Sequence, residues 1–320
     1  MTDRVVLAGA SGFIGAALRE SFEGRGATIT TIGRGGADVR WGDAAGIRRA
    51  VDGADLVVNL AGKSVNCRYD AANRREIFRS RLDTTRELAD AIAGSEHPPP
   101  LWLNASTATI YRHAEDRPMT ESTGEIGEGF SVNVATSWEE AFFDRNLPGT
   151  RRVALRMAIV LGDGSALRPL LALARWGLGG PQLDGRWPAT KARLAAGTYH
   201  RFRARGGRQR FSWVHLDDVV AIVHFLREHP ELDGPVNVVA PGATDNRTLM
   251  RTVRRAVGRP LGLPAFRWML ELGTAVLRTE TELVLKSRWV APERLEQAGY
   301  AFLYREHEPA IRAIVAATGR

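Results

Sequence analysis

The sequence predicts an α/β fold, in which a doubly wound parallel sheet is followed by a smaller C-terminal α+β lobe. Three observations support this prediction. Short apolar segments alternate with amphipathic segments of helical period through the first half of the chain. A glycine-rich turn directly follows the first apolar segment. After Gly164 this alternation gives way to Leu- and Arg-rich helical sequence.

The glycine-rich turn has the form of a dinucleotide-binding turn in a Rossmann fold. It follows an apolar strand at residues 5–7 and precedes an amphipathic helix. Gly9 can make the tight turn, Gly12 lets the backbone approach a pyrophosphate, and Gly15 lets the helix pack closely on the strand. The N-terminus of the helix would then face the phosphates. A tight turn with no ligand is the alternative interpretation.

The end of the second strand predicts which dinucleotide is bound. The strand at residues 28–32 is followed by Gly33 and Arg34. An NAD-binding site usually has Asp or Glu here to hold the ribose 2′-hydroxyl, whereas a guanidinium group matches a 2′-phosphate. Arg34 therefore favours NADP(H), the alternative being a solvated arginine in a surface turn.

The sheet is predicted to continue with parallel strands at residues 56–60, 101–104 and 153–156. Between them, residues 73–93 have the period of a helix, and Arg81 falls on its apolar stripe. A charge on an inward face needs a partner. The partner of Arg81 is expected to be a cofactor phosphate, a substrate acid or a buried carboxylate.

The change after Gly164 from alternating segments to Leu- and Arg-rich helical sequence predicts the domain boundary. We expect an NADP-binding Rossmann domain at residues 1–165, with late strands from residues 211–240, and a substrate lobe at residues 166–320. The lobe would contain a basic insertion at residues 182–208 and closing helices at residues 246–257 and 309–317.

Composition is that of a well-cored globular protein rather than a disordered one, with 44% hydrophobic and 25% charged residues in 320. Cys67 is the single cysteine, so no intrachain disulfide can form. The sequence opens on a strand with no leader pattern, from which a cytoplasmic location is expected. The apolar runs are far shorter than the roughly 20 residues of a membrane span. We expect no membrane partner and no metal site.

The net charge is +8 and the pI is about 10.3. Part of the excess positive charge is concentrated in a basic tract with interleaved aromatic residues at residues 186–210. This tract could bind phosphate or a polyanion, or it could be a solvated loop. A nucleic-acid partner is disfavoured because the dinucleotide motif already accounts for part of the positive potential.

The motifs together resemble the extended short-chain dehydrogenase/reductases, through Gly9-Ala-Ser-Gly12-Phe-Ile-Gly15 and Asn59-Leu60-Ala61-Gly62. Downstream segments resemble an atypical subgroup, the NAD-dependent epimerase-like proteins with a DUF1731 C-terminal domain, also called family 39U or YfcH-like. The resemblance covers nearly the whole chain, and the matching segments are residues 62–69, 80–85, 177–180, 212–215, 240–246, 286–292 and 299–302.

The resemblance implies that the Rossmann domain holds NADP(H) and that the lobe takes a small-molecule substrate. It places Ser11, Gly12, Phe13 and Ile14 at the pyrophosphate, and Gly33 and Arg34 at the ribose phosphate. It places Leu60, Ala61 and Gly62 at the central ribose region, with Glu76, Arg81 and Val160 also near the cofactor.

One departure from the resemblance concerns catalysis. Typical members use a Tyr followed four residues later by a Lys, whereas this chain has Ser131 and Ala135 at those positions. Ser106 and Tyr111, at the end of the preceding strand, are the candidates for orienting the substrate and donating the proton. Lys63 or Arg81 could supply positive charge. Alternatively, Tyr111 is a packing residue whose hydroxyl is bonded internally.

Two functions follow as expectations. The first is an NADP(H)-dependent oxidoreductase or nucleotide-sugar-epimerase-like enzyme that acts on a small polar substrate. The second is a non-catalytic NADP(H)-binding redox sensor or partner-binding protein, in which the Tyr/Lys pair is dispensable. The sequence predicts no particular substrate or oligomeric state.

Overall fold

The structure is a computed structural model that describes residues 2–164, 166–199, 202, 204, 206–276 and 280–318. Its centre is a seven-stranded sheet of order β10-β6-β5-β4-β1-β2-β3, in which all neighbouring strands are parallel. The predicted doubly wound parallel sheet is therefore confirmed. The strands are β1 (Arg4–Ala8), β2 (Thr28–Gly33), β3 (Val39–Arg40), β4 (Leu56–Asn59), β5 (Leu101–Thr107), β6 (Arg151–Met157) and β10 (Gly234–Val238).

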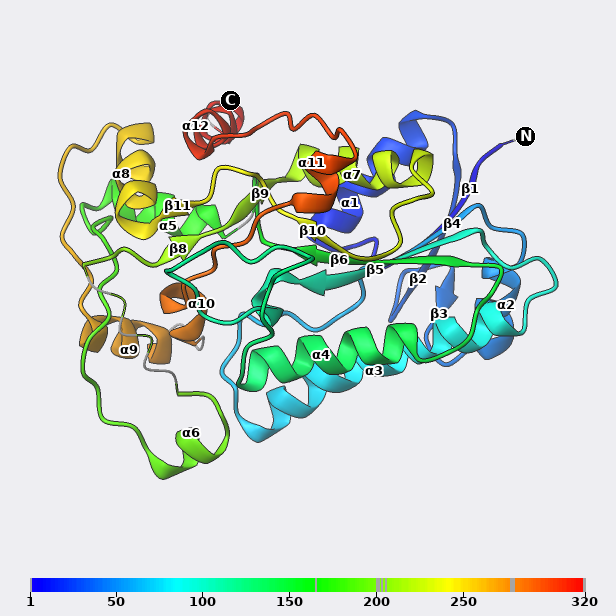
Figure 1. The fold of residues 1–320 in the computed structure, drawn as a ribbon, viewed down its shortest axis with the longest axis horizontal. Coiled ribbons are helices and arrows are strands. Elements are labelled where there is room, and N and C mark those ends of the chain that lie inside the picture. Colours follow the sequence, from blue (N-terminus) through cyan, green and yellow to red (C-terminus); the bar gives the residue numbers. More distant parts are fainter. Residues whose placement is uncertain are drawn as a thin grey trace.

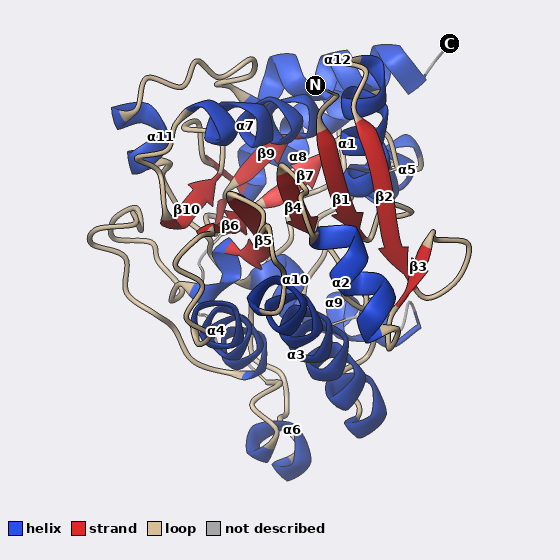
Figure 2. Ribbon diagram, turned by 90° about the vertical axis from the view of Figure 1, so that its right-hand side faces the viewer, coloured by secondary structure: helices blue, strands red, loops and turns tan. Residues whose placement is uncertain are grey.

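Helices cover both faces of this sheet (Figures 1 and 2). The sequence of β1 shows why two covered faces are required, because Val5 and Leu7 point into one buried cluster while Val6 and Ala8 point into the other. One layer contains α1 (Phe13–Gly24), α7 (Leu216–Glu228) and α11 (Glu293–Gln297); the other contains α2 (Ala44–Val51), α3 (Ala71–Ala93) and α4 (Phe130–Phe143).

Local sequence signals fix the ends of α3, which carries part of the site. The side chain of Asp70 caps the helix by accepting a hydrogen bond from the backbone N–H of Asn73 at 2.7 Å. Ile77, Leu88 and Ile92 are buried on its inner face. Gly94 follows the last turn. The opposite face of α3 is polar and remains accessible, and this leaves it free to line a cavity.

A second, smaller lobe lies at the left of Figure 1. Its core is formed mainly by helices, and the closing helix begins at His307, two residues before the expected start. The lobe contains β7 (Ile159–Leu161), α5 (Leu167–Arg175), α6 (Lys191–Ala195), β8 (Arg210–Phe211), β9 (Trp213–His215), β11 (Thr244–Asp245), α8 (Asn246–Ala256), α9 (Arg267–Val276), α10 (Glu282–Leu285) and α12 (His307–Thr318).

The chain returns from the lobe to the main sheet through β10, which pairs with β6. The preceding strand β9 instead pairs with β7 in a separate two-stranded sheet. Arg201, Arg203 and Arg205 of the predicted basic tract lie outside the described residues. In the described part of the chain, no helix is both long enough and apolar enough to cross a membrane.

Candidate functional site

A cavity of about 380 Å³ lies where β1, β2 and β4 end, against the polar face of α3. This is the edge at which ligands bind in parallel α/β sheets. Many of the predicted binding residues line it, and the full lining is Gly9, Ser11, Gly12, Gly33, Arg34, Trp41, Leu60, Ala61, Gly62, Lys63, Glu76, Arg79, Ser80, Asp83, Thr84 and Glu87.

The three motif glycines have different physical roles. A Cβ on Gly15 would lie 2.3 Å from the carbonyl oxygen of Gly9, so Gly15 permits the close approach of α1 to the turn. Gly9 has φ of +84° and its Cβ would lie 2.9 Å from the backbone of Leu60. A Cβ on Gly12 would meet only the Gly9 oxygen, at 3.3 Å. Packing within the protein therefore explains Gly9 and Gly15, whereas Gly12 leaves room on the cavity side.

The N-terminus of α1 faces the part of the cavity beside Gly12. Gly12 is its N-cap, and among the described residues no side chain caps the first turn and no acidic residue lies within it. The unpaired N–H groups and the positive end of the helix dipole are therefore available to an anion. A pyrophosphate is the chemical group that fits this arrangement.

Arg34 lies beside Gly33 at the far end of the cavity. Its side chain is exposed, and within the described ranges no carboxylate is at ion-pair distance from it. A guanidinium group that is free of acidic partners can form charge-assisted hydrogen bonds to a phosphate. Trp41 lines the same end and was not predicted from the sequence.

Arg81 does point inward, as its position on the helical stripe predicted. Its Nη1 donates hydrogen bonds to the carbonyl oxygens of Lys63, at 3.0 Å, and Ile77, at 3.1 Å, and its guanidinium lies over the ring of Trp138. Burial lowers the pKa of Arg81 to about 10, against the smaller opposing electrostatic effects of Tyr69 and Cys67. No carboxylate of the described chain pairs with it, so the buried-carboxylate alternative is not observed.

Arg81 supports the site from beneath rather than lining it. A Cβ on Gly62 would lie 3.2 Å from its guanidinium carbon, so the backbone of Gly62 separates Arg81 from the cavity. Phe13, Ile14, Gly15 and Val160 are also absent from the cavity lining. The ring of Phe13 approaches Gly162, and Ile14 and Val160 pack on the core.

The lining residues that sequence reasoning missed come mostly from one stripe of α3. The polar stripe runs along successive turns of the helix and comprises Glu76, Arg79, Ser80, Asp83, Thr84 and Glu87. Only Glu76 was predicted. The spacing of three and four residues was a readable signal, because polar residues at this period share one face of a helix.

Ser106 and Tyr111 belong to a buried hydrogen-bond network. The Ser106 hydroxyl donates to Glu139 at 2.5 Å, and Arg156 binds both oxygens of that carboxylate, at 2.8 and 2.6 Å. Arg156 also donates to the Tyr111 hydroxyl at 2.8 Å, and this hydroxyl donates to Asn237 at 2.9 Å. Tyr111 is 2% exposed and Ser106 is 4% exposed. Burial raises the pKa of Tyr111, against the opposing effect of Arg156.

A second polar cluster lies where the first turn of α4 meets the lobe. The hydroxyls of Tyr69 and Ser131 are hydrogen-bonded, and Ser131 donates to Glu282 at 2.9 Å. On the other side of the cluster, Lys286 and Arg288 both donate hydrogen bonds to Thr109. Lys286 Nζ lies 2.8 Å from the Thr109 carbonyl oxygen, and Arg288 Nε lies 3.2 Å from its hydroxyl. Burial raises the pKa of Tyr69 to about 12 and lowers that of Lys286 to about 8.

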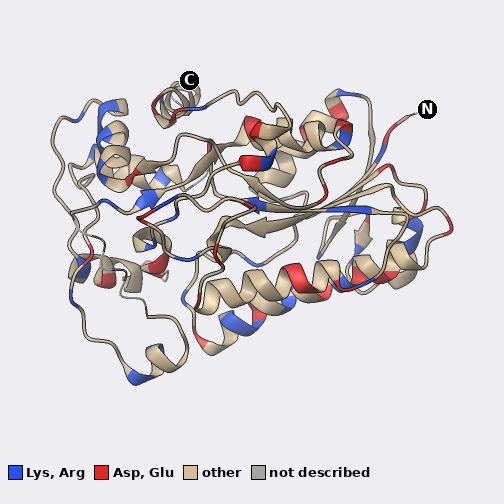
Figure 3. Cartoon of the chain, in the orientation of Figure 1, with Lys and Arg blue, Asp and Glu red and all other residues tan. Residues whose placement is uncertain are grey.

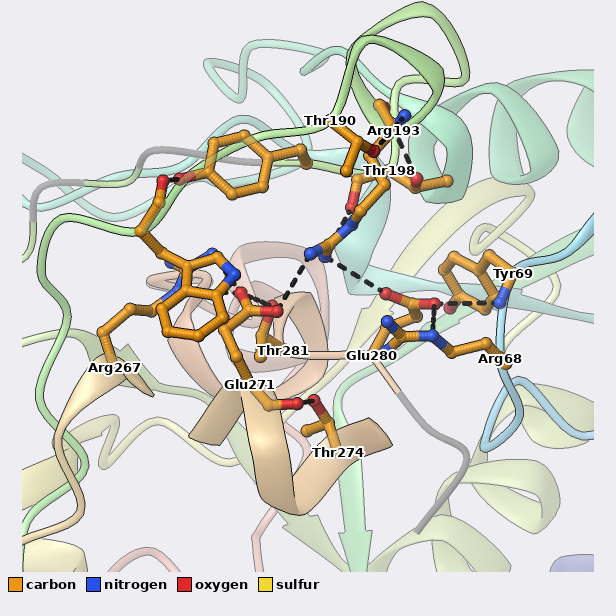
Figure 4. A network of polar contacts seen from close by, with 12 residues as sticks. Arg68, Tyr69, Thr190, Arg193, Thr198, Arg267, Glu271, Thr274, Glu280 and Thr281 are labelled. Carbon is orange, nitrogen blue, oxygen red and sulfur yellow. Dashed lines mark hydrogen bonds and ion pairs between the residues drawn. The ribbon is translucent and has the colours of Figure 1, made fainter. Parts of the chain in front are cut away.

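A third network joins the basic insertion to the rest of the lobe and to the segment before α3 (Figure 4). Arg193 pairs with Glu271 at 2.9 Å and with Glu280 at 3.6 Å. Glu280 accepts a hydrogen bond from the backbone N–H of Tyr69 at 2.9 Å, and Arg267 binds Glu271 at 2.7 Å. Arg193 is therefore an anchored member of the insertion, neither solvated nor free for a polyanion.

The chain is similar in sequence to known proteins. The sequence matches the NAD dependent epimerase/dehydratase family over residues 5–131 and a domain of unknown function, DUF1731, over residues 265–314. It is 32% identical to the epimerase family protein SDR39U1 of Bos taurus, over 98% of this chain and 100% of the relative. It is 26% identical to the epimerase family protein YfhF of Bacillus subtilis, over 98% of both chains.

Solved structures agree with this relationship. The crystal structure of human epimerase family protein SDR39U1 with NADPH superposes with a TM-score of 0.83 and 28% identity, over 98% of this chain and 99% of that one. A UDP-N-acetylglucosamine 4-epimerase from Bacillus cereus shares the fold at a TM-score of 0.70, with 16% identity over 99% and 97% of the two chains. The resemblance expected from the motifs is confirmed.

Proposed function

The chain belongs to the epimerase family that includes the SDR39U1 proteins, and on this premise we propose that it is an NADP(H)-dependent, epimerase-like oxidoreductase acting on a small polar substrate. The observation that carries the proposal is the cavity at the end of the sheet. It combines a glycine cradle at a helix N-terminus with an unpaired arginine at the position of the adenosine ribose. The related human protein was crystallised with NADPH.

The residues of the cavity fit the parts of a dinucleotide phosphate. Ser11 and Gly12 would hold the pyrophosphate, with Gly9, Phe13, Ile14 and Gly15 shaping the turn. Gly33 and Arg34 would hold the ribose 2′-phosphate, and Trp41 offers a flat apolar surface nearby. When bound, NADPH supplies a hydride for reduction of the substrate.

The loop after β4 would hold the central part of the cofactor. Leu60, Ala61 and Gly62 line the cavity with Glu76 opposite them on α3. Arg81 would act through Gly62 by fixing the backbone of Lys63, and Val160 would support the turn through packing. The loop and Glu76 would contact the cofactor because they line the cavity, whereas Arg81 and Val160 would act only by supporting the backbone.

Ser106 and Tyr111 serve in this proposal as positioning residues. Each hydroxyl already has protein partners, so proton donation by Tyr111 would require its bonds to Arg156 and Asn237 to be exchanged for substrate. Their network instead joins β5, α4, β6 and β10, and so fixes these elements relative to one another.

Tyr69 and Ser131 are a second pair of hydroxyls that this proposal offers for proton transfer, and like Tyr111 they already have protein partners. Ser131 has one hydroxyl proton and gives it to Glu282, so the phenol of Tyr69 is left to donate to Ser131. For reduction the proton would move the other way: Tyr69 would give its proton to the substrate oxygen and take one from Ser131, which would take one from the protonated carboxyl of Glu282. Lys286 and Arg288 lie beside that carboxylate and would stabilise negative charge on a reacting oxygen.

The decisive experiment combines binding and turnover. NADPH and NADH are titrated against the protein by cofactor fluorescence, and NADPH oxidation is then followed against a panel of small polar carbonyl compounds. Tight NADPH binding with turnover supports the enzyme. Tight binding with no hydride transfer to any carbonyl would favour the redox sensor, whose support is the sealed Ser106–Tyr111 network. Absence of NADPH binding would contradict both.

A further inference from the structure

The lobe has a surface where exposed apolar side chains are surrounded by arginines. It is formed by the end of α5, the segment that follows it and the segment after α8. We call it the Trp176 face. Its apolar members are Leu173, Trp176, Leu178, Leu261 and Leu263.

Backbone pairing holds the two segments of the Trp176 face together. The N–H of Leu263 donates to Gly177 at 2.9 Å, and the N–H of Gly180 donates to Leu263 at 3.0 Å. A Cβ on Gly262 would lie 2.8 Å from the backbone of Gly179, so glycine is required where the segments touch. The apolar side chains are therefore presented by a fixed framework.

The exposure of these side chains is unusual. Trp176 is 84% exposed, Leu261 is 82% exposed and Leu263 is 65% exposed. A single exposed leucine needs no explanation, but an exposed tryptophan grouped with several leucines marks an interaction surface. The Trp176 face is therefore a candidate interaction surface.

The charge around the face identifies the partner. Residues 164–183 and 246–266 contain no Asp or Glu and seven arginines: Arg168, Arg175, Arg247, Arg251, Arg254, Arg255 and Arg259. Arg247, Arg251 and Arg255 recur every four residues on the exposed side of α8. Figure 3 shows the corresponding basic colouring of α8 and α5 at this end of the molecule.

We propose that the Trp176 face docks the protein onto an anionic lipid surface. Tryptophan and leucine side chains partition into the interfacial region of a bilayer, and arginines next to them bind the anionic headgroups. The Trp176 face presents exposed apolar side chains and arginines together at one end of the molecule. Docking of this kind needs no membrane-spanning segment. The proposal therefore departs from the expectation of no membrane partner, which rested on the lack of such a segment.

A second copy of the chain is a poorer occupant. Symmetric contact of two such faces would bring seven arginines against seven others with no acidic residue from these segments to separate them. Like charges in contact are unfavourable. An acidic protein partner would match the charge, and the experiment below distinguishes it from lipid.

The test uses the full chain and vesicles made of phosphatidylcholine with about one-third phosphatidylglycerol, which supply a negative surface potential. We expect co-sedimentation with these vesicles, little with pure phosphatidylcholine, and weakening as salt is raised from about 0.05 to 0.5 M. Failure of the wild-type protein to bind the anionic vesicles would overturn the proposal and leave an acidic protein as the occupant.

Matched variants separate the face from the overall charge. Arg251→Glu/Arg255→Glu is compared with Arg48→Glu/Arg49→Glu on α2, at the other end of the molecule. Both pairs change the net charge equally. The first should weaken binding by about tenfold or more, since each surface arginine contributes about 1 kcal/mol, and the second much less. Equal loss from both pairs would show non-specific attraction and would refute the proposal.

The apolar contribution has its own readout. Trp176→Ala/Leu261→Ala should weaken vesicle binding, whereas Leu303→Ala, at an exposed leucine outside the face with 62% exposure, should not. Brominated lipids should quench tryptophan fluorescence in the wild type but much less in Trp176→Phe, which keeps an apolar ring. Quenching that is unchanged in Trp176→Phe would contradict insertion of this face, as would a dimer that disappears in the Trp176→Ala/Leu261→Ala variant.

Discussion

Nη1 of Arg156 lies 2.8 Å from the hydroxyl oxygen of Tyr111, in the interior of the protein. The same guanidinium lies over the Tyr111 ring, with its carbon 5.1 Å from the ring centroid. Because Arg156 is also bound to Glu139, the phenol is one end of a continuous ionic network. This relationship makes Tyr111 part of the scaffold of the site.

Replacement of Tyr111 by Phe should therefore lower stability more than it alters cofactor binding. The variant loses hydrogen bonds to Arg156 and Asn237 and leaves both groups buried without that partner. The free energy of unfolding should fall by about 1 to 3 kcal/mol, while the NADPH dissociation constant stays within about twofold. Urea unfolding and cofactor titration measure the two effects, and unchanged stability would contradict the scaffold role.

Arg34→Ala should weaken NADPH binding by about tenfold to a hundredfold and leave NADH binding nearly unchanged. The reason is that charge-assisted hydrogen bonds to a 2′-phosphate contribute roughly 1.5 to 3 kcal/mol. Arg40→Ala is the matched control, because Arg40 is exposed on the next strand and is absent from the cavity lining. An NADPH preference that survives in Arg34→Ala would refute the role of Arg34.

Sequence reasoning was most successful where local pattern determines structure. The strand and glycine turn at the start of the chain were predicted because their physical constraints are contained within a few residues. The end of β5 was predicted three residues too early, because the strand continues through the polar residues Ser106 and Thr107, whereas β6 ends at Met157, one residue beyond its predicted end. A strand buried by neighbours on both sides can carry such residues when partners are available.

The hydrogen-bond partners of the predicted catalytic residues could not be predicted from the sequence. The partner of Ser106 is 33 residues away, and the two partners of Tyr111 are 45 and 126 residues away. Tyr69 and Ser131 come together with Glu282 only when the lobe packs on the sheet domain, and Glu282 is 151 residues from Ser131. Contacts of this range have no local sequence signal.

Two glycine substitutions should separate ligand binding from folding. Gly12→Val should abolish binding of both dinucleotides in a folded protein, because its side chain would fill the cavity side of the turn. Gly15→Ala should destabilise the fold by about 1 to 3 kcal/mol, because its Cβ meets backbone. Circular dichroism, thermal unfolding and NADPH titration measure these effects. Wild-type affinity in a folded Gly12→Val variant would exclude the phosphate cradle.

The buried Lys286 should make stability depend on pH in the alkaline range. Burial lowers its pKa to about 8, whereas in an unfolded chain lysine remains protonated to about pH 10.4. Between these values the unfolded state binds the extra proton, so the stability of the folded state should rise with pH, by at most about 1.4 kcal/mol per unit. The difference in unfolding free energy between wild type and Lys286→Met, measured from about pH 7.5 to 9.5, should show this rise. A difference that does not change with pH would contradict the lowered pKa.

Catalysis provides the sharpest comparison between the two tyrosines. If Tyr69 gives its proton to the substrate oxygen and is re-protonated through Ser131 and Glu282, Tyr69→Phe should lower turnover of the substrate found in the carbonyl panel by about 10² or more, with NADPH affinity unchanged. Tyr111→Phe is the matched variant, since it also removes the hydroxyl of a buried tyrosine, and it should keep turnover within about tenfold once stability is allowed for. The kinetic pH profile separates proton transfer from simple misfolding, because loss of a general acid changes its shape and not only its height. A large loss in Tyr111→Phe with full activity in Tyr69→Phe would reverse the assignment and make Ser106 and Tyr111 the catalytic pair.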